Sequence, residues 1–199
     1  MSVEAPGESK IGEVVDQEEV FDHRFLRVTR RTIETPLGKI REQLVWDRGN
    51  KRFAVAIAET QQNQFILIEE PKYGQMKEML VVPAGGVKKG ETPLYAAQRE
   101  LREETGYYTE DWIPLMGGKS MVDFPDKVAG GEHLFFYGRN ATQVCDPEPE
   151  RKLKLVTREQ AEALLDRRLE ELELEIAMSW VALSAALRYI NVEKEITYG

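Results

Sequence analysis

The stretch from Thr92 to Gly106 constrains the fold more than any other part of the sequence, because it carries both a start and a stop signal for a helix. Thr92 is a good N-cap residue, and Pro93 is well tolerated in the first helical turn. Apolar residues recur on one side of the segment, and Gly106 is a residue that commonly ends a helix. The sequence therefore predicts a helix from Thr92-Pro93 to Gly106.

Three acidic side chains share one face of this predicted helix. Glu103 and Glu104 follow Glu100 at the three- and four-residue spacings that make side chains neighbours on a helix. Like charges at these spacings cost about 0.2–0.5 kcal/mol per pair when nothing compensates them. A hard divalent cation such as Mg²⁺, which prefers oxygen ligands, would compensate them. Taken alone, however, the three residues are more typical of a solvated, charged helix face.

The rest of the chain mixes strand and helix patterns without a regular alternation, which favours the α+β class over a doubly wound sheet. We divide it into a disordered tail (1–10), an antiparallel N-terminal β lobe (11–50) and a main domain (51–199). Strands are predicted within residues 11–46 and at 53–58, 65–70, 79–82, 112–116, 133–137 and 153–156, and further helices at 158–170 and 173–190.

Composition excludes several functional classes. The net charge of −8 argues against binding long nucleic acids through their phosphates, which requires a basic excess. Cys145 is the only cysteine and neither histidine lies at ligand spacing to it, so neither a disulfide nor a zinc site is expected. The polar N-terminus and the absence of a long apolar run argue against a signal peptide and a membrane span. A cytoplasmic location is the default expectation.

The acidic helix and the glycine-rich turn before it together resemble the Nudix box. That pattern is glycine, five residues, glutamate, seven residues, and then Arg-Glu-(apolar)-x-Glu-Glu-x-Gly-(apolar). The residues that fill it are Gly85, Glu91, Arg99, Glu100, Leu101, Glu103, Glu104 and Gly106. Only the last position departs, because Tyr107 stands where an aliphatic residue is usual. This match is far more specific than the three glutamates alone.

The resemblance implies a Nudix α/β/α sandwich with a mixed sheet, and hydrolysis by attack of a metal-activated water on phosphorus. It implies that Mg²⁺ (or Mn²⁺) is bound by Glu100, Glu103, Glu104 and the carbonyl of Ala84. Glu103 and Glu104 would also take part in catalysis. Supporting roles would fall to Gly85, Glu91 and Arg99.

More loosely, residues 11–190 resemble the ADP-ribose and nucleoside-diphosphate-sugar pyrophosphatases. In that subgroup an N-terminal strand lobe builds a homodimer, and an Arg-Glu pair, here Arg41-Glu42, contacts the nucleobase. The expected products are a nucleoside monophosphate and a sugar phosphate. Lys72 stands near the place of a usual arginine, and it could bind phosphate but not as a bidentate fork. Pro125 is the candidate for a substrate-binding proline of the ADP-ribose enzymes, at a slightly longer offset.

The subgroup also has a late loop glutamate that acts as a base or extra ligand, and several residues could fill this role. The candidates are Glu148 and Glu150 in the acidic loop, and Glu132 beside Gly130-Gly131. Trp46, Tyr73 and Phe124 could stack on a base, although such residues are more often core or turn residues.

Two other functions stay open. One is a dinucleoside-polyphosphate or RNA-end pyrophosphohydrolase, which the acidic charge and the N-terminal lobe disfavour. The other is a Nudix fold that senses a nucleotide without catalysis, which the complete set of box carboxylates disfavours.

Overall fold

The structure is a computed structural model that describes residues 12–23, 26–47, 51–122, 128–129, 131–166, 174 and 176–198. The predicted tail (1–10), Phe124, Pro125 and the end of the helix predicted over 158–170 lie outside these residues. The chain divides into two compact units, Met1–Lys51 with Val122–Gly131 and Arg52–Met121 with Glu132–Gly199. Each unit is described by itself.

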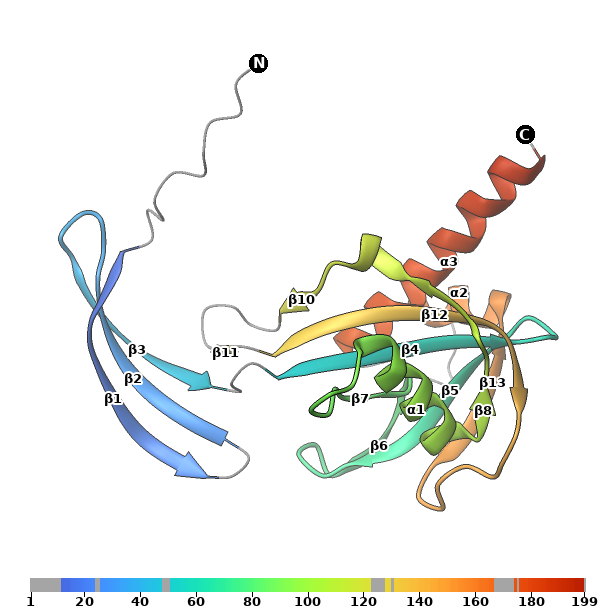
Figure 1. Ribbon diagram of the computed structural model, residues 1–199, viewed down its shortest axis with the longest axis horizontal. Coiled ribbons are helices and arrows are strands. Elements are labelled where there is room, and N and C mark those ends of the chain that lie inside the picture. The colour runs from blue at the N-terminus through green and yellow to red at the C-terminus, as the bar shows by residue number, and fades with distance from the viewer. Residues whose placement is uncertain are drawn as a thin grey trace. The chain divides into compact units, whose positions relative to one another are not determined.

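The long strands of the first unit form an antiparallel sheet, as the alternating sequence pattern predicts (Figure 1). Its long strands are β1 (Glu13–His23), β2 (Leu26–Glu34) and β3 (Ile40–Asp47), and β2 pairs with both of the others. A short fourth strand, β11 (Val128–Ala129), pairs in parallel with the end of β3. Far-separated segments of the chain therefore meet in this sheet.

The second unit contains a mixed sheet whose main order is β10-β12-β4-β5-β13. β4 and β12 run parallel, whereas β5 runs antiparallel to β4, β6 and β13. Short β7 pairs with β4, and β8 and β9 pair with β12. The strands are β4 (Arg52–Thr60), β5 (Gln64–Lys72), β6 (Lys77–Val81), β7 (Ala84–Gly86), β8 (Tyr107–Tyr108), β9 (Asp111–Pro114), β10 (Met121–Val122), β12 (Glu132–Gln143) and β13 (Lys152–Thr157).

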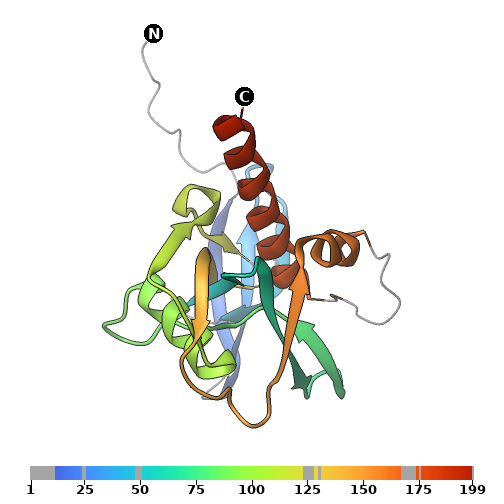
Figure 2. The same ribbon diagram turned by 90° about the vertical axis from the view of Figure 1, so that its right-hand side faces the viewer.

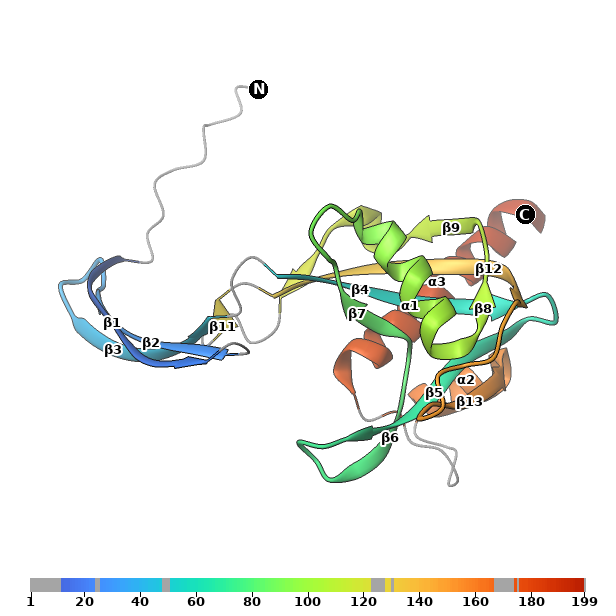
Figure 3. The same cartoon turned by 60° about the horizontal axis from the view of Figure 1, so that its bottom comes forward.

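Helices cover both faces of this sheet, which confirms the predicted α/β/α sandwich (Figures 2 and 3). Alternate residues of a strand face opposite sides, so β4 contributes to two cores. Its alanines at 54, 56 and 58 pack with Leu101 of α1 (Pro93–Thr105), while Val55 and Ile57 pack with Leu183 of α3 (Ala177–Tyr198). The second helical layer consists of α2 (Arg158–Leu165) and α3 (Ala177–Tyr198).

The predicted helix signals are present in α1. The hydroxyl of Thr92 accepts a hydrogen bond from the Tyr95 N–H (3.2 Å), and Pro93 lies in the first turn. Gly106 ends the helix in the left-handed conformation (φ 76°), and its N–H donates to the carbonyl of Arg102. A Cβ at Gly106 would lie 2.1 Å from the carbonyl oxygen of Cys145, so only glycine fits there. These caps fix where α1 begins and ends.

Several predicted elements differ in extent from the structure, among them the strand predicted at 133–137, which is the longer β12. The strand predicted at 112–116 is β9, and it gives way to a 3-10 turn, η1 (Leu115–Gly118), in which Met116 and Gly117 adopt left-handed angles. The helix predicted over 173–190 is α3, which begins at Ala177 and continues to Tyr198. Its exposed final turns carry no apolar pattern from which their helical state could be predicted. None of the described helices combines the length and the apolar character that a membrane crossing requires.

Candidate active site

The turn from β7 into α1 brings Gly85 against the carboxylate of Glu100. A Cβ built on Gly85 would lie 1.9 Å from Glu100 Oε1, well inside any real contact. The Glu100 side chain is mostly buried, and burial raises the pKa of its carboxyl. Gly85 therefore provides the space in which Glu100 lies.

Arg99 is the centre of a hydrogen-bond network that organises this acidic face. Its Nε and Nη2 donate to the two carboxylate oxygens of Glu91 (2.9 and 3.2 Å). Its Nη1 donates to Glu100 (2.6 Å) and to Glu103 (3.1 Å), and its Nη2 also donates to the Gly86 carbonyl (3.0 Å). The Arg99 side chain is only 9% exposed, so this network is held firmly.

Glu91 closes the network on the side of the loop. Its carboxylate accepts the N–H of Lys88 (2.9 Å) as well as the two bonds from Arg99. The hydrogen bonds from Arg99, the larger cause, and from Lys88 lower the pKa of Glu91. Glu91 thus holds Arg99 in the position from which Arg99 can orient the carboxylates of Glu100 and Glu103.

Glu104 is the most deeply buried carboxylate of the helix. Its Oε2 accepts the N–H of Ala84 (3.1 Å), and its Oε1 forms an ion pair with Arg151 (3.1 Å). Burial, and then the negative charges of Glu100 and Glu148, raises the pKa of Glu104 to about 8. A positively charged partner would therefore stabilise the ionised carboxylate of Glu104.

Two further residues of the site were not identified from the sequence. Glu70, near the end of β5, is buried and forms ion pairs with Lys72 and Arg151. Burial lowers the pKa of Lys72, which the nearby charge of Glu104 opposes. The two-residue spacing of Glu70 and Lys72 on a strand is a usable signal, since it puts both on one face. Arg151 carries no comparable signal in the sequence.

The acidic loop reaches the site through Glu148. Its N–H donates to the Glu103 carbonyl (3.2 Å), and its carboxylate lies 3.4 Å from Arg151 Nε. Glu150 is exposed and makes no ion pair with a described residue. Glu132 is exposed at the start of β12, in register with Arg52 of β4.

The remaining predicted substrate residues form no hydrogen bond or ion pair with this cluster or lie outside the described chain. Arg41 and Glu42 are exposed on β3 of the first unit, opposite Ile33 and Thr32 of β2. Tyr73 (72% exposed) lies in the turn after β5, and Trp46 is half-exposed on β3. Pro125 and Phe124 are outside the described residues.

The donor set fits a hard divalent cation, although the side chains do not converge on one point. Within the described residues no three acidic, histidine or cysteine side chains form a cluster that could hold a metal ion. Glu100 and Glu103 instead bond to Arg99, and Glu104 bonds to Ala84 and Arg151. Carboxylate oxygens are the ligands that such cations prefer, and burial and like charge raise the pKa values of Glu100 and Glu104. A bound cation would relieve that repulsion.

Known proteins resemble this chain in sequence and in fold. A "Methanol dehydrogenase activator" from Bacillus methanolicus is 28% identical over 88% of this chain and 95% of its own length. An "ADP-ribose pyrophosphatase" from Bacillus subtilis is 28% identical over 61% of this chain and 63% of its own. The solved structure of an "ADP compounds hydrolase" superposes with a TM-score of 0.81 at 19% identity, covering 94% of this chain and 98% of that one, and so shows the same fold.

The family follows from the match over most of the chain. The model of the NUDIX domain matches residues 50–192, which include the whole second sheet, α1 and the acidic face. The resemblance predicted from the Gly85–Gly106 pattern is thereby confirmed, and the chain belongs to the NUDIX domain family.

Proposed function

We propose that this NUDIX-family pyrophosphohydrolase uses Mg²⁺ to hydrolyse the diphosphate linkage of ADP-ribose or a related nucleoside diphosphate sugar. The products would be a nucleoside monophosphate and a sugar phosphate. The observation that carries the proposal is the acidic face of α1, with Arg99 bonded to Glu91, Glu100 and Glu103 beside the strand end at Ala84. Relatives named ADP-ribose pyrophosphatase and ADP-sugar pyrophosphatase support this choice of substrate class.

Glu100, Glu103, Glu104 and the Ala84 carbonyl are the groups that would hold the ion. When bound, the ion would lower the pKa of a coordinated water and neutralise charge on the diphosphate. Arg99 keeps the carboxylates of Glu100 and Glu103 on one side of α1. The N–H of Ala84, the first residue of β7, keeps the Glu104 carboxylate against that strand.

Glu148 is the candidate general base that the geometry favours. Its backbone bonds to Glu103, and its charge contributes to the raised pKa of Glu104, so it lies beside the carboxylates. Glu150 makes no comparable contact with the described residues. In the proposed step Glu148 takes a proton from the attacking water as its oxygen bonds to phosphorus, and the bond to the bridging oxygen breaks.

Two cations near the carboxylates are available for the diphosphate. Lys72 and Arg151 both pair with the buried Glu70, and Arg151 reaches Glu104. Arginine and lysine are the usual partners of phosphate oxygens, and Arg151 can bind in the bidentate manner that Lys72 cannot. We assign to Arg151 the phosphate-binding role that the sequence alone suggested for Lys72.

The first unit supports a homodimer. Large apolar side chains, each between 46% and 61% exposed, cover its sheet: Val14, Val15, Val20, Phe21, Ile40, Leu44 and Trp46. Exposed apolar sets of this kind mark protein–protein contacts. Light scattering after size exclusion should report a dimer, and Phe21→Glu should shift it towards the monomer. A wild-type monomer at micromolar concentration would contradict the assignment.

A product-identified substrate panel tests the activity. ADP-ribose, sugar nucleotides, dinucleoside polyphosphates and 5′-triphosphate RNA would be incubated with Mg²⁺ or Mn²⁺ and the products identified. We expect turnover of ADP-ribose or a sugar nucleotide that Glu104→Gln removes and Glu195→Gln, on an exposed turn of α3, preserves. Full turnover by Glu104→Gln would disprove the site. Preferred cleavage of RNA or of dinucleotides would point to the alternative enzymes, and tight binding without turnover to a sensor.

A second candidate function rests on the relative that matches most of both chains. Because that relative is named for activation of methanol dehydrogenase, this chain could raise the rate of a methanol dehydrogenase. The test is alcohol oxidation by that enzyme with and without the protein, with Glu104→Gln as the comparison. No change in rate at equimolar protein would exclude this function.

A further inference from the structure

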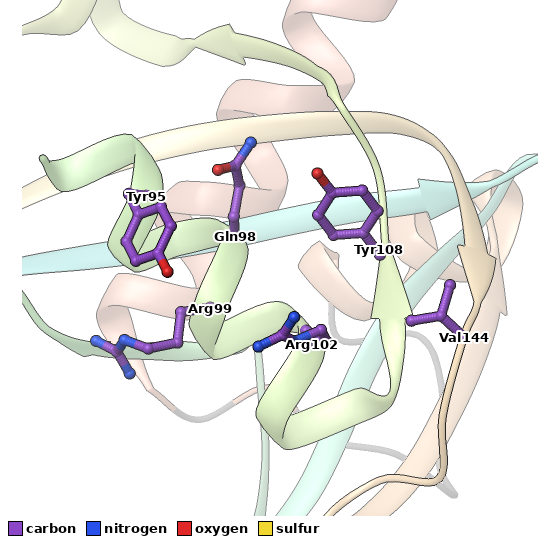
Figure 4. Close-up of a pocket in the computed structure, with 6 residues that line it drawn as sticks. All are labelled: Tyr95, Gln98, Arg99, Arg102, Tyr108 and Val144. Atoms are coloured by element: carbon purple, nitrogen blue, oxygen red, sulfur yellow. The ribbon is translucent and has the colours of Figure 1, made fainter. Parts of the chain in front are cut away.

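A cavity of about 310 Å³ lies beside α1, and none of its lining residues is a carboxylate. Four of its lining residues belong to α1, and Tyr108 of β8 and Val144 after β12 close the other side (Figure 4). Its volume is at the lower end of the range for small-molecule sites. The α1 residues are Tyr95, Gln98, Arg99 and Arg102.

The helix geometry directs two of the lining residues away from the acidic face. Gln98 and Arg102 form one row along α1, at i and i+4, and Glu100 and Glu104 form another row two residues later. Two residues correspond to about 200° around a helix, so the rows face nearly opposite directions. Arg99 lies between them, and its guanidinium is already committed to Glu91, Glu100 and Glu103. The row of Gln98 and Arg102 therefore faces the cavity rather than the side of Glu100 and Glu104, and Arg99 is the lining residue that also belongs to the network of the acidic face.

Arg102 gives the cavity an uncompensated positive charge. Within the part of the chain that the structure describes, its guanidinium has neither a hydrogen bond nor an ion pair. The same holds for the side-chain amide of Gln98. In Figure 4 Gln98 lies between Tyr95 and Tyr108, and Arg102 lies below them, one turn further along α1. A free guanidinium binds phosphate or carboxylate oxygens, and a free amide can recognise the polar edge of a base.

The tyrosines add flat surfaces to this charge. The Tyr95 side chain is 57% exposed, Tyr108 is partly exposed, and Val144 offers an apolar contact. Exposed aromatic rings stack on nucleobases whatever their sequence, and the energy per base is substantial. Two rings, one amide and one guanidinium around a single cavity therefore match a ligand that combines a planar aromatic group with an anion.

We propose that this cavity is a second ligand site that binds a mononucleotide or a similar planar aromatic phosphate. In this site Arg102 holds the phosphate, one or both tyrosine rings stack on the base, and Gln98 bonds to its edge. The site is independent of the proposed hydrolysis, since it uses none of the residues assigned to the metal or the diphosphate.

Calorimetric titration of the full chain with adenosine monophosphate in EDTA tests the site. EDTA prevents metal-dependent binding at the acidic face, and Glu104→Gln serves as a further check that binding does not depend on it. We expect measurable binding by wild type and by Glu104→Gln, and affinity at least about tenfold weaker in Arg102→Gln and in Tyr95→Ala. Arg188→Gln, a change of an exposed arginine on α3, is the matched control and should bind as wild type does.

Adenosine and inorganic phosphate separate the two halves of the ligand. Adenosine should bind weakly and lose affinity in Tyr95→Ala but not in Arg102→Gln, whereas phosphate should show the reverse. Wild-type affinity for the monophosphate in both Arg102→Gln and Tyr95→Ala, or no binding of any of the four common mononucleotides at millimolar concentration, would overturn the proposal. Circular dichroism of each variant would show that the fold is intact.

Discussion

Gly85 and Glu100 share a volume that cannot hold both a glutamate carboxylate and a Cβ atom. The Cβ position of residue 85 lies 1.9 Å from Glu100 Oε1 and 2.1 Å from Glu100 Cδ. β7 and the middle of α1 are thus packed so closely that the space between them cannot hold one additional methyl group. The first glycine of the box is explained by this contact rather than by an unusual backbone angle, because Gly85 is not among the glycines with positive φ.

Gly85→Ala should therefore impair activity more than stability. The group that must move is the flexible end of Glu100, so the free energy of unfolding should change by about 1 kcal/mol or less. Displacing a ligand by an ångström can lower the rate by about a hundredfold, and we expect a loss of that order in kcat/KM. Gly86→Ala is the matched control, since a Cβ there meets nothing within 4 Å and its carbonyl stays available to Arg99. Equal activity of the two variants would contradict this account.

Glu91 and Arg99 should behave as one unit in kinetics. Arg99→Lys keeps the charge but loses the fork that reaches Glu91, Glu100 and Glu103, and Glu91→Gln removes the carboxylate that holds that fork. Changes to residues that orient metal ligands cost about 10- to 100-fold in activity or in metal affinity. The double variant should be little worse than Arg99→Lys alone, in kcat/KM and in Mn²⁺ affinity measured by calorimetry. Multiplied losses would show that Glu91 acts separately from Arg99.

The elements that the sequence predicted are those with local signals. The caps of α1, the hairpin of β4 and β5 and the capping box of α2 each depend on residues a few positions apart. The parallel pairing of β4 with β12 joins residues about 80 positions apart, such as Phe53 and His133, and no local pattern encodes it. The family resemblance supplied the mixed sheet, but not its register.

The same distinction applies to the site. Residues of the Gly85–Gly106 pattern were found because their spacing along one turn and one helix is fixed. Glu70 and Arg151 were missed because Arg151 joins Glu70 to Glu104 only after β5 and β13 pair in the folded sheet. A buried glutamate at a strand end looks, in sequence, like an ordinary exposed one. Burial and long-range pairing had to be seen in three dimensions.

Arg151→Gln should affect both stability and activity. The change leaves the buried carboxylate of Glu70 with Lys72 alone and removes the ion pair to Glu104. Loss of such a partner costs about 1–3 kcal/mol, which should appear as a lower Tm, and the missing cation should raise KM for the diphosphate substrate. Lys152→Gln is the adjacent control, because its side chain is 59% exposed and pairs with an exposed Glu78. The free energy of unfolding of Lys152→Gln should stay within about 0.5 kcal/mol of wild type, so its Tm should change little. An unchanged KM in Arg151→Gln would show that Arg151 is not part of the substrate site.

Ionisation of Glu104 should make the metal-free protein less stable as pH rises. Burial raises its pKa to about 8 in the folded chain, whereas the unfolded value is 4.5, so the folded state binds more protons between these values. The stabilisation is complete below pH 4.5 and is lost as pH rises through 8. The side chain of Glu104→Gln stays neutral at every pH. The difference between its Tm and that of wild type, measured in EDTA, should therefore increase by several degrees from pH 5 to pH 8.5, which corresponds to roughly 1–3 kcal/mol of unfolding free energy.

Divalent metal should reverse this order. At pH 8.5, millimolar Mg²⁺ should raise the Tm of wild type and leave that of Glu104→Gln nearly unchanged, because a carboxylate binds the ion and an amide binds it poorly. Glu195→Gln should follow wild type in both conditions, since the Glu195 carboxylate that it removes is exposed on α3.

A Tm difference between Glu104→Gln and wild type that is the same at pH 5 and pH 8.5, measured by scanning fluorimetry in EDTA, would show that Glu104 is ionised in the folded protein without a loss of stability. In that case Arg151, at 3.1 Å, already compensates its charge, and metal would have to displace that ion pair to bind there.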